Sequence, residues 1–175
     1  MKAKNMARCA LFAAILCVCA YLAVPFGTVY VTMQTFGVFL CLLLLGGKYG
    51  TITIGLYLLL GSVGLPVFSG FRGGIGTLLD TTGGYLLGFF VMGLAYWLIT
   101  SFFGNQNKIK ILACGAGLIL CYGFGTAWYW HLYLQNGGSG TLLLVILTCV
   151  VPYVLPDALK LMLAYFLSRR LKTIV

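Results

Sequence analysis

The sequence predicts an all-helical integral membrane protein with six transmembrane helices, and three observations support this class. The chain is 62% hydrophobic and only 7% charged, and its mean hydropathy is +1.07, which soluble domains of this size do not show. Six apolar segments, each near the ~20 residues needed to cross the hydrocarbon core, follow one another along the chain. No segment alternates apolar and polar residues as the wall of a membrane barrel must, so strands are not expected. A single membrane domain over residues 1–175 is therefore predicted.

The first two apolar segments, 9–24 and 30–46, are separated by the turn PFGT at 25–28. The first segment follows three basic residues, which is also the general shape of a cleaved signal peptide. No A-x-A cleavage site follows it, however, and five more apolar segments do, so we predict a transmembrane helix instead. The second segment ends at the turn GKYG, residues 47–50.

The third segment, 51–65, ends before Pro66, which a helix does not easily continue through. A long loop over 64–81 follows. The remaining segments are 82–103, 109–133 and 141–167, separated by the polar turn GNQNK and the flexible stretch QNGGSG.

The basic residues predict that both termini lie in the cytoplasm. The net charge of +9 comes from bases scattered at the ends of apolar runs, which is typical of topology signals and not of a nucleic-acid-binding patch. With the N-terminus inside, Arg72 is the only base outside, and Lys160 lies within the membrane. The predicted cytoplasmic bases are Lys2, Lys4, Arg8, Lys48, Lys108, Lys110, Arg169, Arg170 and Lys172. The lipid bilayer is thus an expected partner, and a nucleic acid is not.

The stretch 64–88 is the most unusual part of the chain. It holds eight glycines and Asp80, one of only two acids in the sequence. Glycine adopts backbone conformations that other residues avoid, so such a stretch folds back tightly over a ligand. Irregular backbone at membrane depth survives where it is buried in protein or lines a cavity. We predict a re-entrant or cap-like extracellular loop; the alternative is a long surface turn between two helices.

Asp157 and Lys160 are predicted to lie near the middle of the bilayer. Asp157 precedes Arg169 by twelve residues, which corresponds to ~18 Å of helix. A charge at this depth costs on the order of 3 kcal/mol, and positions i and i+3 share one helix face. Either both groups face a cavity and bind a polar ligand, or they form a self-neutralising ion pair. Pro152 and Pro156 are expected to kink this helix and open space beside it.

The first helix carries a stripe of small residues, Ala3, Ala7, Ala10 and Ala14. Small residues let helices approach closely in lipid. The stripe is expected either to pack inside the six-helix bundle or to dock another membrane protein. Gly84 and Gly88 form a GxxxG on the fourth helix, for which internal packing is expected.

Motifs of enzymes and metal sites are missing from the sequence. Lys48 follows Gly47 but is followed by tyrosine, so there is no Walker A loop. There is no G-x-S-x-G, no HExxH, and no cysteine or histidine spacing of a metal site. We therefore predict no catalytic residue, no metal and no resident cofactor. If the protein moves a solute uphill, the ATPase is expected on another chain.

Four colinear segments together resemble the BioY family, the biotin-specific substrate-binding (S) components of energy-coupling-factor (ECF) transporters, which belong to the ABC class. The segments are VTMQTFGVFLCLLLLGGKYG at 31–50, LYLLLGSVGLPVFSGFRGGIG at 56–76, TGGYLLGF at 82–89 and PDALK at 156–160. The resemblance implies a six-helix fold in the plasma membrane of a prokaryote and high-affinity capture of biotin from outside. It also implies a transmembrane coupling protein and two cytoplasmic ATPase subunits as partners, and the alanine stripe looks like the family's docking motif.

The resemblance also implies a biotin site. Asp157 and Lys160 match the family's PDxxK motif, and a carboxylate accepts a ureido N–H while an ammonium donates to the ureido oxygen. Arg72 is the expected partner of the biotin carboxylate. The chain reads Asp80-Thr81-Thr82-Gly83-Gly84-Tyr85 where the family usually has GPTGGY, so the capping loop differs at the ligand end. The other predicted binding residues are Gln34, Asp80 and Tyr85.

Two other functions remain compatible with the residues. One is an S component for a different vitamin, such as thiamine or riboflavin, whose ring would stack on aromatic side chains. The other is a stand-alone secondary transporter driven by protons through Asp157. Dissipating the proton gradient would stop the second kind of uptake but not one driven by ATPases.

Overall fold

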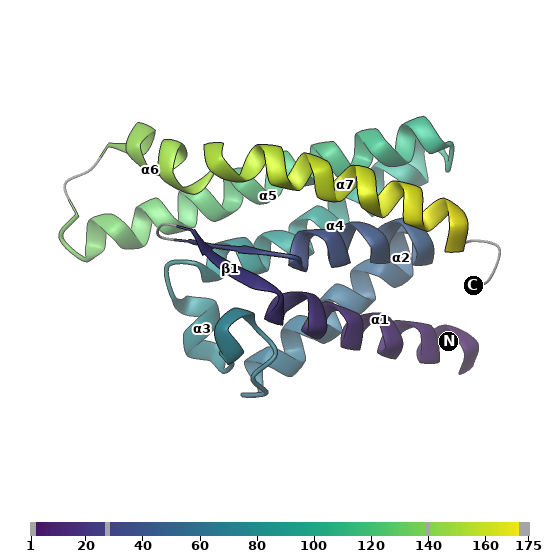
Figure 1. Cartoon of the computed structure of the whole chain (residues 1–175), viewed down its shortest axis with the longest axis horizontal. Helices are drawn as coiled ribbons and strands as arrows, with labels where there is room; N and C mark the ends of the chain where they lie inside the picture. Colours follow the sequence, from purple (N-terminus) through teal and green to yellow (C-terminus); the bar gives the residue numbers. More distant parts are fainter. Residues whose placement is uncertain (1–2, 27–28, 139–140, 172–175) are drawn as a thin grey trace.

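The computed structural model describes residues 3–26, 29–138 and 141–171, and within them the fold is a bundle of helices with one small hairpin (Figure 1). The long helices are α1 (Ala3–Tyr21), α2 (Gln34–Ser62), α4 (Gly83–Phe103), α5 (Asn107–Gln135) and α7 (Val151–Leu171). Five helical stretches of the described residues are long and apolar enough to cross a membrane. The helical, multi-pass membrane fold expected from composition is therefore confirmed.

The helix α2 folds back on itself. Gly46 has φ 78° and ψ 175°, which is not helical and which favours glycine. The Nε2 of Gln34 donates to the hydroxyl of Tyr57 at 2.6 Å, although a straight helix would separate them by ~35 Å. The two arms, before and after Gly46, therefore run antiparallel, which is the pair of segments that the sequence indicates around the turn GKYG.

A two-stranded antiparallel hairpin precedes α2 and corrects the expectation that the chain has no strands. The strands are β1 (Ala23–Phe26) and β2 (Val29–Thr32), with Ala23 opposite Thr32. The predicted second helix over 30–46 therefore starts later, at Gln34. Four-residue strands are too short for a visible alternation, but the sequence VYVT is rich in the β-branched and aromatic residues that strands favour.

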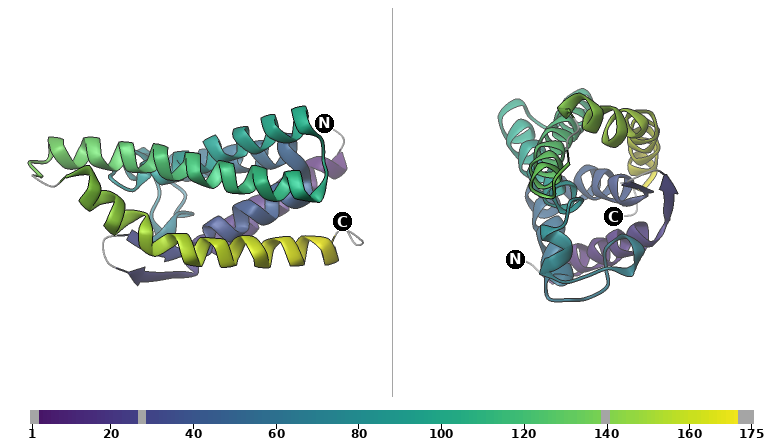
Figure 2. Two further views of the ribbon diagram at one scale, coloured as in Figure 1. Left: turned by 90° about the horizontal axis from the view of Figure 1, so that it is seen from above. Right: turned by 90° about the vertical axis from the view of Figure 1, so that its left-hand side faces the viewer.

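The predicted sixth helix, 141–167, is divided in two. α6 (Leu142–Cys149) is followed by Val150, whose φ of −120° and ψ of −56° depart from helical geometry, and α7 begins at the next residue. Pro152 stands in the first turn of α7, where its missing N–H costs nothing, whereas Pro156 lies inside the helix. The break tilts α6 away from α7 (Figure 2).

The core of the bundle is formed around α2, which packs against α1, α4 and α7, while α4 also packs against α5. Glycines set the close approach of α4 to α5. A Cβ added at Gly84 would lie 2.4 Å from the Cβ of Trp128, and one at Gly88 would lie 2.8 Å from the Sγ of Cys121. The GxxxG of α4 thus packs inside the bundle, as expected.

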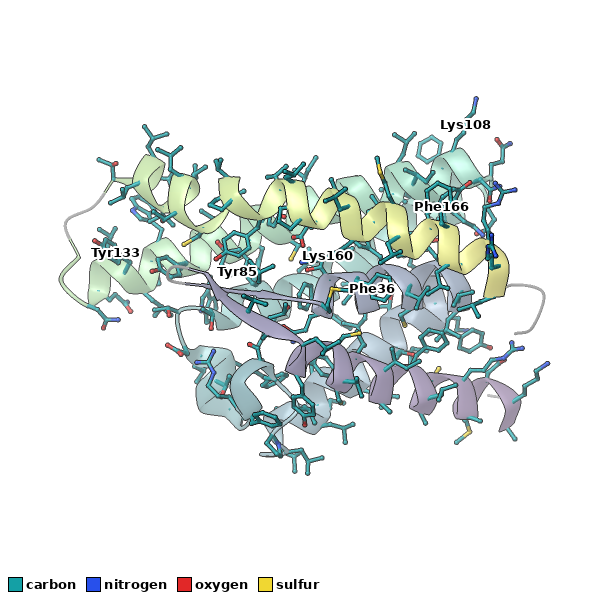
Figure 3. All side chains as sticks on the ribbon, in the orientation of Figure 1. Phe36, Tyr85, Lys108, Tyr133, Lys160 and Phe166 are labelled. Carbon is teal, nitrogen blue, oxygen red and sulfur yellow. The ribbon has the colours of Figure 1, made fainter. Side chains whose placement is uncertain are left out.

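The two ends of the bundle differ. The start of α1, the turn at Gly46 and the end of α7 lie together at one end (Figure 1). The short helices η1 (Ser69–Phe71) and α3 (Ile75–Leu79) lie toward the opposite end, beside the hairpin. Lys108 and Tyr133, near the two ends of α5, mark these opposite ends in Figure 3.

Candidate functional site

The candidate site is a partly open cavity. Residues of β2, α2, the segment 69–82, α4, α5, α6 and α7 line it, so every described membrane helix except α1 contributes. Most of the exposed surface of the wall is apolar, but nine of the seventeen described lining residues are polar or charged, so the site combines apolar surface with many hydrogen-bonding groups.

The polar centre of the cavity is an ion pair on α7. The Nζ of Lys160 lies 2.6 Å from the Oδ1 of Asp157, and the hydroxyl of Tyr122 on α5 donates to the Oδ2 of Asp157, also at 2.6 Å. Asp157 is 4% exposed and Lys160 is 7% exposed, yet both line the cavity. The pair is thus both an internal ion pair and part of the cavity wall. The two alternatives drawn from the sequence, a self-neutralising pair and a pair that faces a cavity, therefore do not exclude each other.

This buried pair keeps unused hydrogen-bonding capacity. A carboxylate has about four acceptor positions and an ammonium has three donors. Asp157 accepts one described bond on each oxygen, and Lys160 donates one described bond to it. A ligand in the cavity that offers both donors and an acceptor therefore meets partners of both kinds on one helix face.

A second polar group, Gln34, stands at the start of α2 and is 4% exposed. Its Oε1 accepts from the hydroxyl of Thr32, and its Nε2 donates to Tyr57, whose hydroxyl donates in turn to the carbonyl of Val67. Gln34 lines the cavity and ties β2 and both arms of α2 to the glycine-rich loop. It therefore fixes this side of the cavity.

The glycine-rich loop forms the mouth of the cavity. Phe68 is fully buried and takes the space beside Gly61, where an added Cβ would lie 2.0 Å from its ring. Tyr21 of α1 holds the loop from outside: its hydroxyl donates to the carbonyl of Pro66 at 2.8 Å, and its ring stacks on Phe71 at 4.5 Å. These anchors present Ser69, Arg72 and Thr77 to the cavity.

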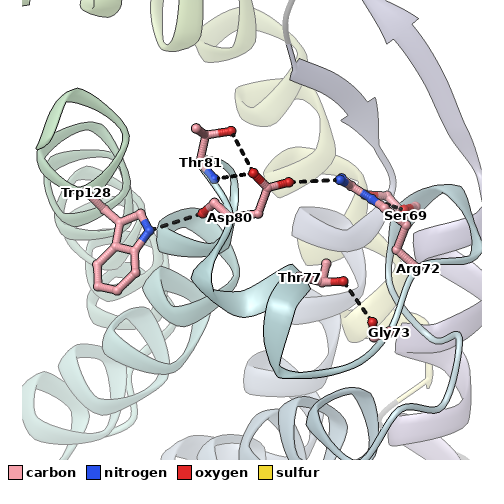
Figure 4. A network of polar contacts seen from close by, with 7 residues as sticks. All are labelled: Ser69, Arg72, Gly73, Thr77, Asp80, Thr81 and Trp128. Atoms are coloured by element: carbon pink, nitrogen blue, oxygen red, sulfur yellow. Dashed lines mark hydrogen bonds and ion pairs between the residues drawn. The ribbon is translucent and has the colours of Figure 1, made fainter. Parts of the chain in front are cut away.

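Arg72 and Asp80 form a second ion pair at this mouth, with Nη1 and Oδ2 3.2 Å apart (Figure 4). The side chains are 40% and 46% exposed, respectively. Asp80 is held on its other side by the main-chain N–H of Thr81, and its carbonyl accepts from the indole N–H of Trp128. The departure from the family pattern at 80–82 is thus an ordered connection between the loop and α5.

Five of the six binding residues predicted from the sequence line this cavity. They are Gln34, Arg72, Tyr85, Asp157 and Lys160. Asp80 does not line the cavity; it forms an ion pair with Arg72, which does. Tyr85, labelled with Lys160 in Figure 3, pairs its hydroxyl with that of Thr126 on α5 at 3.1 Å. Tyr122 and Tyr153 also line the cavity, and the sequence carries no signal that marks them as binding residues.

The alanine stripe lies on the outside of α1. Ala3, Ala7, Ala10 and Ala14 are all exposed, whereas α1 buries other residues against the bundle. The alternative in which the stripe packs inside the bundle is therefore wrong. The stripe is therefore a face of small residues that no other described residue of the chain covers. It lies on α1, the one described membrane helix that does not line the cavity.

The described residues contain no group of three or more His, Cys, Asp or Glu side chains that could hold a metal ion. The seven cysteines are free thiols, six of them buried.

Comparisons with known proteins agree on one family. The BioY family model matches residues 1–175. The chain is 37% identical over 170 residues to the biotin transporter BioY of Thermotoga maritima, which covers 97% of this chain and 96% of that protein. It is 36% identical over 176 residues to a probable biotin transporter BioY of Pyrococcus horikoshii, covering 98% of each. A crystal structure of the S-component for biotin from an ECF-type ABC transporter superposes with a TM-score of 0.84 at 25% identity, over 98% of this chain and 92% of that one.

Proposed function

Because the chain belongs to the BioY family, we propose that it captures biotin in the cavity around Asp157 and Lys160 and takes part in its uptake as the S component of an ECF transporter. The observation that carries this proposal is the buried ion pair on the cavity wall, 2.6 Å between Nζ and Oδ1. A buried charge pair is a poor source of stability, and ionisable groups within a membrane usually mark a substrate path.

The ureido ring of biotin suits this pair because it has two N–H donors and one carbonyl acceptor. The Asp157 carboxylate accepts a ureido N–H, and the Lys160 ammonium donates to the ureido oxygen. The bond from Tyr122 to the Oδ2 of Asp157 fixes the plane of the carboxylate before the ligand arrives. Such preorganisation lowers the ordering cost of binding.

The rest of biotin is assigned to the outer part of the cavity. Tyr85, Leu86 and Tyr153 line it and offer apolar and aromatic surface to the thiophane ring and the valeryl chain. Arg72 stands at the mouth, where the carboxylate of the valeryl chain emerges. Biotin is therefore oriented with its ureido ring inward and its acid end outward.

We further propose that the end of the bundle where α1 begins and α7 ends lies in the cytoplasm. Arg169 and Arg170 stand in the last turn of α7, and Lys108 lies at the same end in Figure 3, in agreement with the excess of basic residues on cytoplasmic loops. The exposed alanine stripe of α1 then faces a transmembrane coupling protein, and two cytoplasmic ATPase subunits supply the energy. Capture of biotin itself is expected to require none of these subunits, because residues of this chain line the cavity.

The loop over 64–81 is expected to become more ordered when biotin binds. Its anchors lie at Pro66, Phe68 and Phe71, whereas Ile75 and Leu79 of α3 are 62% and 58% exposed. Closure over the ligand must offset roughly 1–2 kcal/mol of backbone entropy for each residue it fixes. Protection of the amides of 71–79 from hydrogen exchange should rise with saturating biotin. Equal exchange with and without biotin would leave the loop a static wall.

Calorimetry of the detergent-purified chain tests the proposed function. We expect biotin to bind in a 1:1 ratio, and thiamine and riboflavin to produce no heat of binding and no competition. Binding of another vitamin in preference to biotin would assign the chain to a different S component. Because the measurement needs no ATPase and no proton gradient, it examines capture apart from transport.

A further inference from the structure

The cavity wall is balanced in charge, and this balance comes from Asp80. Among the described residues that line the cavity, the cations are Arg72 and Lys160, and each is paired with an aspartate. These two aspartates are the only acids in the sequence. The inner pair is buried, whereas the Arg72–Asp80 pair stands in partial contact with water at the mouth.

Asp80 is positioned by contacts that do not depend on a ligand. Its Oδ1 accepts from the N–H of Thr81 at 2.7 Å and from the hydroxyl of Thr81 at 3.3 Å. Its carbonyl accepts from Trp128 at 3.1 Å. Figure 4 shows these bonds on one side of Asp80 and Arg72 on the other. The negative charge is thus held beside Arg72 at a site that is not itself part of the cavity wall.

Arg72 keeps donors for a ligand while its charge is offset. A guanidinium has five N–H donors in a fixed plane. In Arg72 the Nε donates to the carbonyl of Ser69 at 3.3 Å and Nη1 donates to Asp80 at 3.2 Å, which leaves three N–H groups. The positions of these N–H groups allow them to donate to a carboxylate, an ester carbonyl or an amide carbonyl. Only the net charge at the mouth would favour the carboxylate over the neutral ester or amide. The negative charge of Asp80 cancels the positive charge of Arg72 there.

Resting on the proposed capture of biotin, we infer that Asp80 is a specificity-determining residue that makes the mouth accept neutral derivatives of the biotin carboxyl group. The proposed ligands are therefore biotin and also the esters and amides of its carboxyl group. Because the side chain of Arg72 is 40% exposed, the substituent of such a derivative extends toward water and needs no room inside the cavity.

The experiment compares Kd values of biotin and biotin methyl ester at pH 7, where the free acid is ionised. It uses the full-length wild type and the variants Asp80→Asn, Arg72→Gln and the double variant. Asparagine keeps an oxygen for the N–H of Thr81 and the main-chain bond to Trp128, so it removes the charge and keeps the loop contacts. The wild type should bind the ester within about fivefold of the acid, because an ion pair this exposed leaves little net field.

In Asp80→Asn the affinity for the acid should rise about fivefold and that for the ester should stay the same, since repulsion between two partly solvated carboxylates is worth about that factor. The double variant should bring the ratio of the two Kd values back to about one. A wild type that binds the acid more than about fiftyfold better than the ester overturns the inference, as does an unchanged ratio in Asp80→Asn. Failure of the wild type to bind either ligand overturns the proposed function together with the inference.

Discussion

Replacement of Asp157 with asparagine is expected to weaken biotin binding by about 1.5–3 kcal/mol, a rise in Kd of about 10- to 150-fold. The reason is the loss of a charged acceptor for the ureido N–H in a site where Asp157 is 4% exposed. Asparagine also turns an N–H₂ group toward one of the two partners, Lys160 and Tyr122, that donate to the carboxylate. The measurement is calorimetric titration of biotin into the purified variant.

The same substitution leaves the Lys160 ammonium buried without a counter-charge, which costs about 3–5 kcal/mol in stability. Thermal unfolding of the unliganded variant measures this second effect separately. Ser168→Ala is the matched control, because Ser168 is a buried polar residue of the same helix that does not line the cavity; it should bind biotin as the wild type does. Near-wild-type affinity in a folded Asp157→Asn variant would make the ion pair purely structural.

Replacement of Ala10 and Ala14 with tryptophan is expected to abolish assembly with the coupling protein and the ATPases and to leave biotin binding unchanged. Both alanines are exposed on α1, and a bulky side chain prevents the close helix approach that small residues permit. The cavity should not respond, because no residue of α1 lines it. Co-purification of the tagged chain with the three partner subunits measures assembly, and calorimetry on the same preparation measures binding.

The control for the substitutions at Ala10 and Ala14 is Ala127→Trp, which adds a tryptophan at an exposed alanine of α5. It should assemble normally if docking is confined to α1. Loss of biotin binding together with assembly in the α1 variant would show that the substitution disturbs the bundle. Normal assembly of the α1 variant would place the docking face elsewhere.

The sequence predicted the helical fold well because a bilayer imposes length and polarity on every crossing segment. Glycines at the turns then marked where segments end, as at Gly46, where the positive φ reverses the chain. The strands over 23–26 and 29–32 were missed because apolar periodicity does not separate a short apolar strand from a helix. The prolines at 152 and 156 predicted a kink in the last helix, but the break itself, at Val150, precedes both of them and is not marked by hydropathy.

The site was predictable where charge stood out against an apolar background. Asp157, Lys160 and Arg72 are conspicuous in a chain with two acids, and all three line the cavity. Tyr122 had no such signal, because a tyrosine in an apolar helix is ordinary, and its bond to Asp157 spans 35 positions in the sequence. Only the fold, in which α5 and α7 line the same cavity, brings them together. The ion pair between Arg72 and Asp80 was likewise not predictable from the sequence, because it depends on the fold of the loop between them.

An experimental structure of the full-length protein with biotin bound would locate the ligand directly. We expect the ureido ring at the closed end of the cavity, with its oxygen within ~2.7–3.2 Å of the Nζ of Lys160 and an N–H donating to the Asp157 carboxylate. The valeryl carboxylate should lie at the mouth beside Arg72. Biotin bound outside this cavity, or with its carboxylate at Lys160 and its ureido ring at the mouth, would show that Asp157 and Lys160 do not bind the ureido ring.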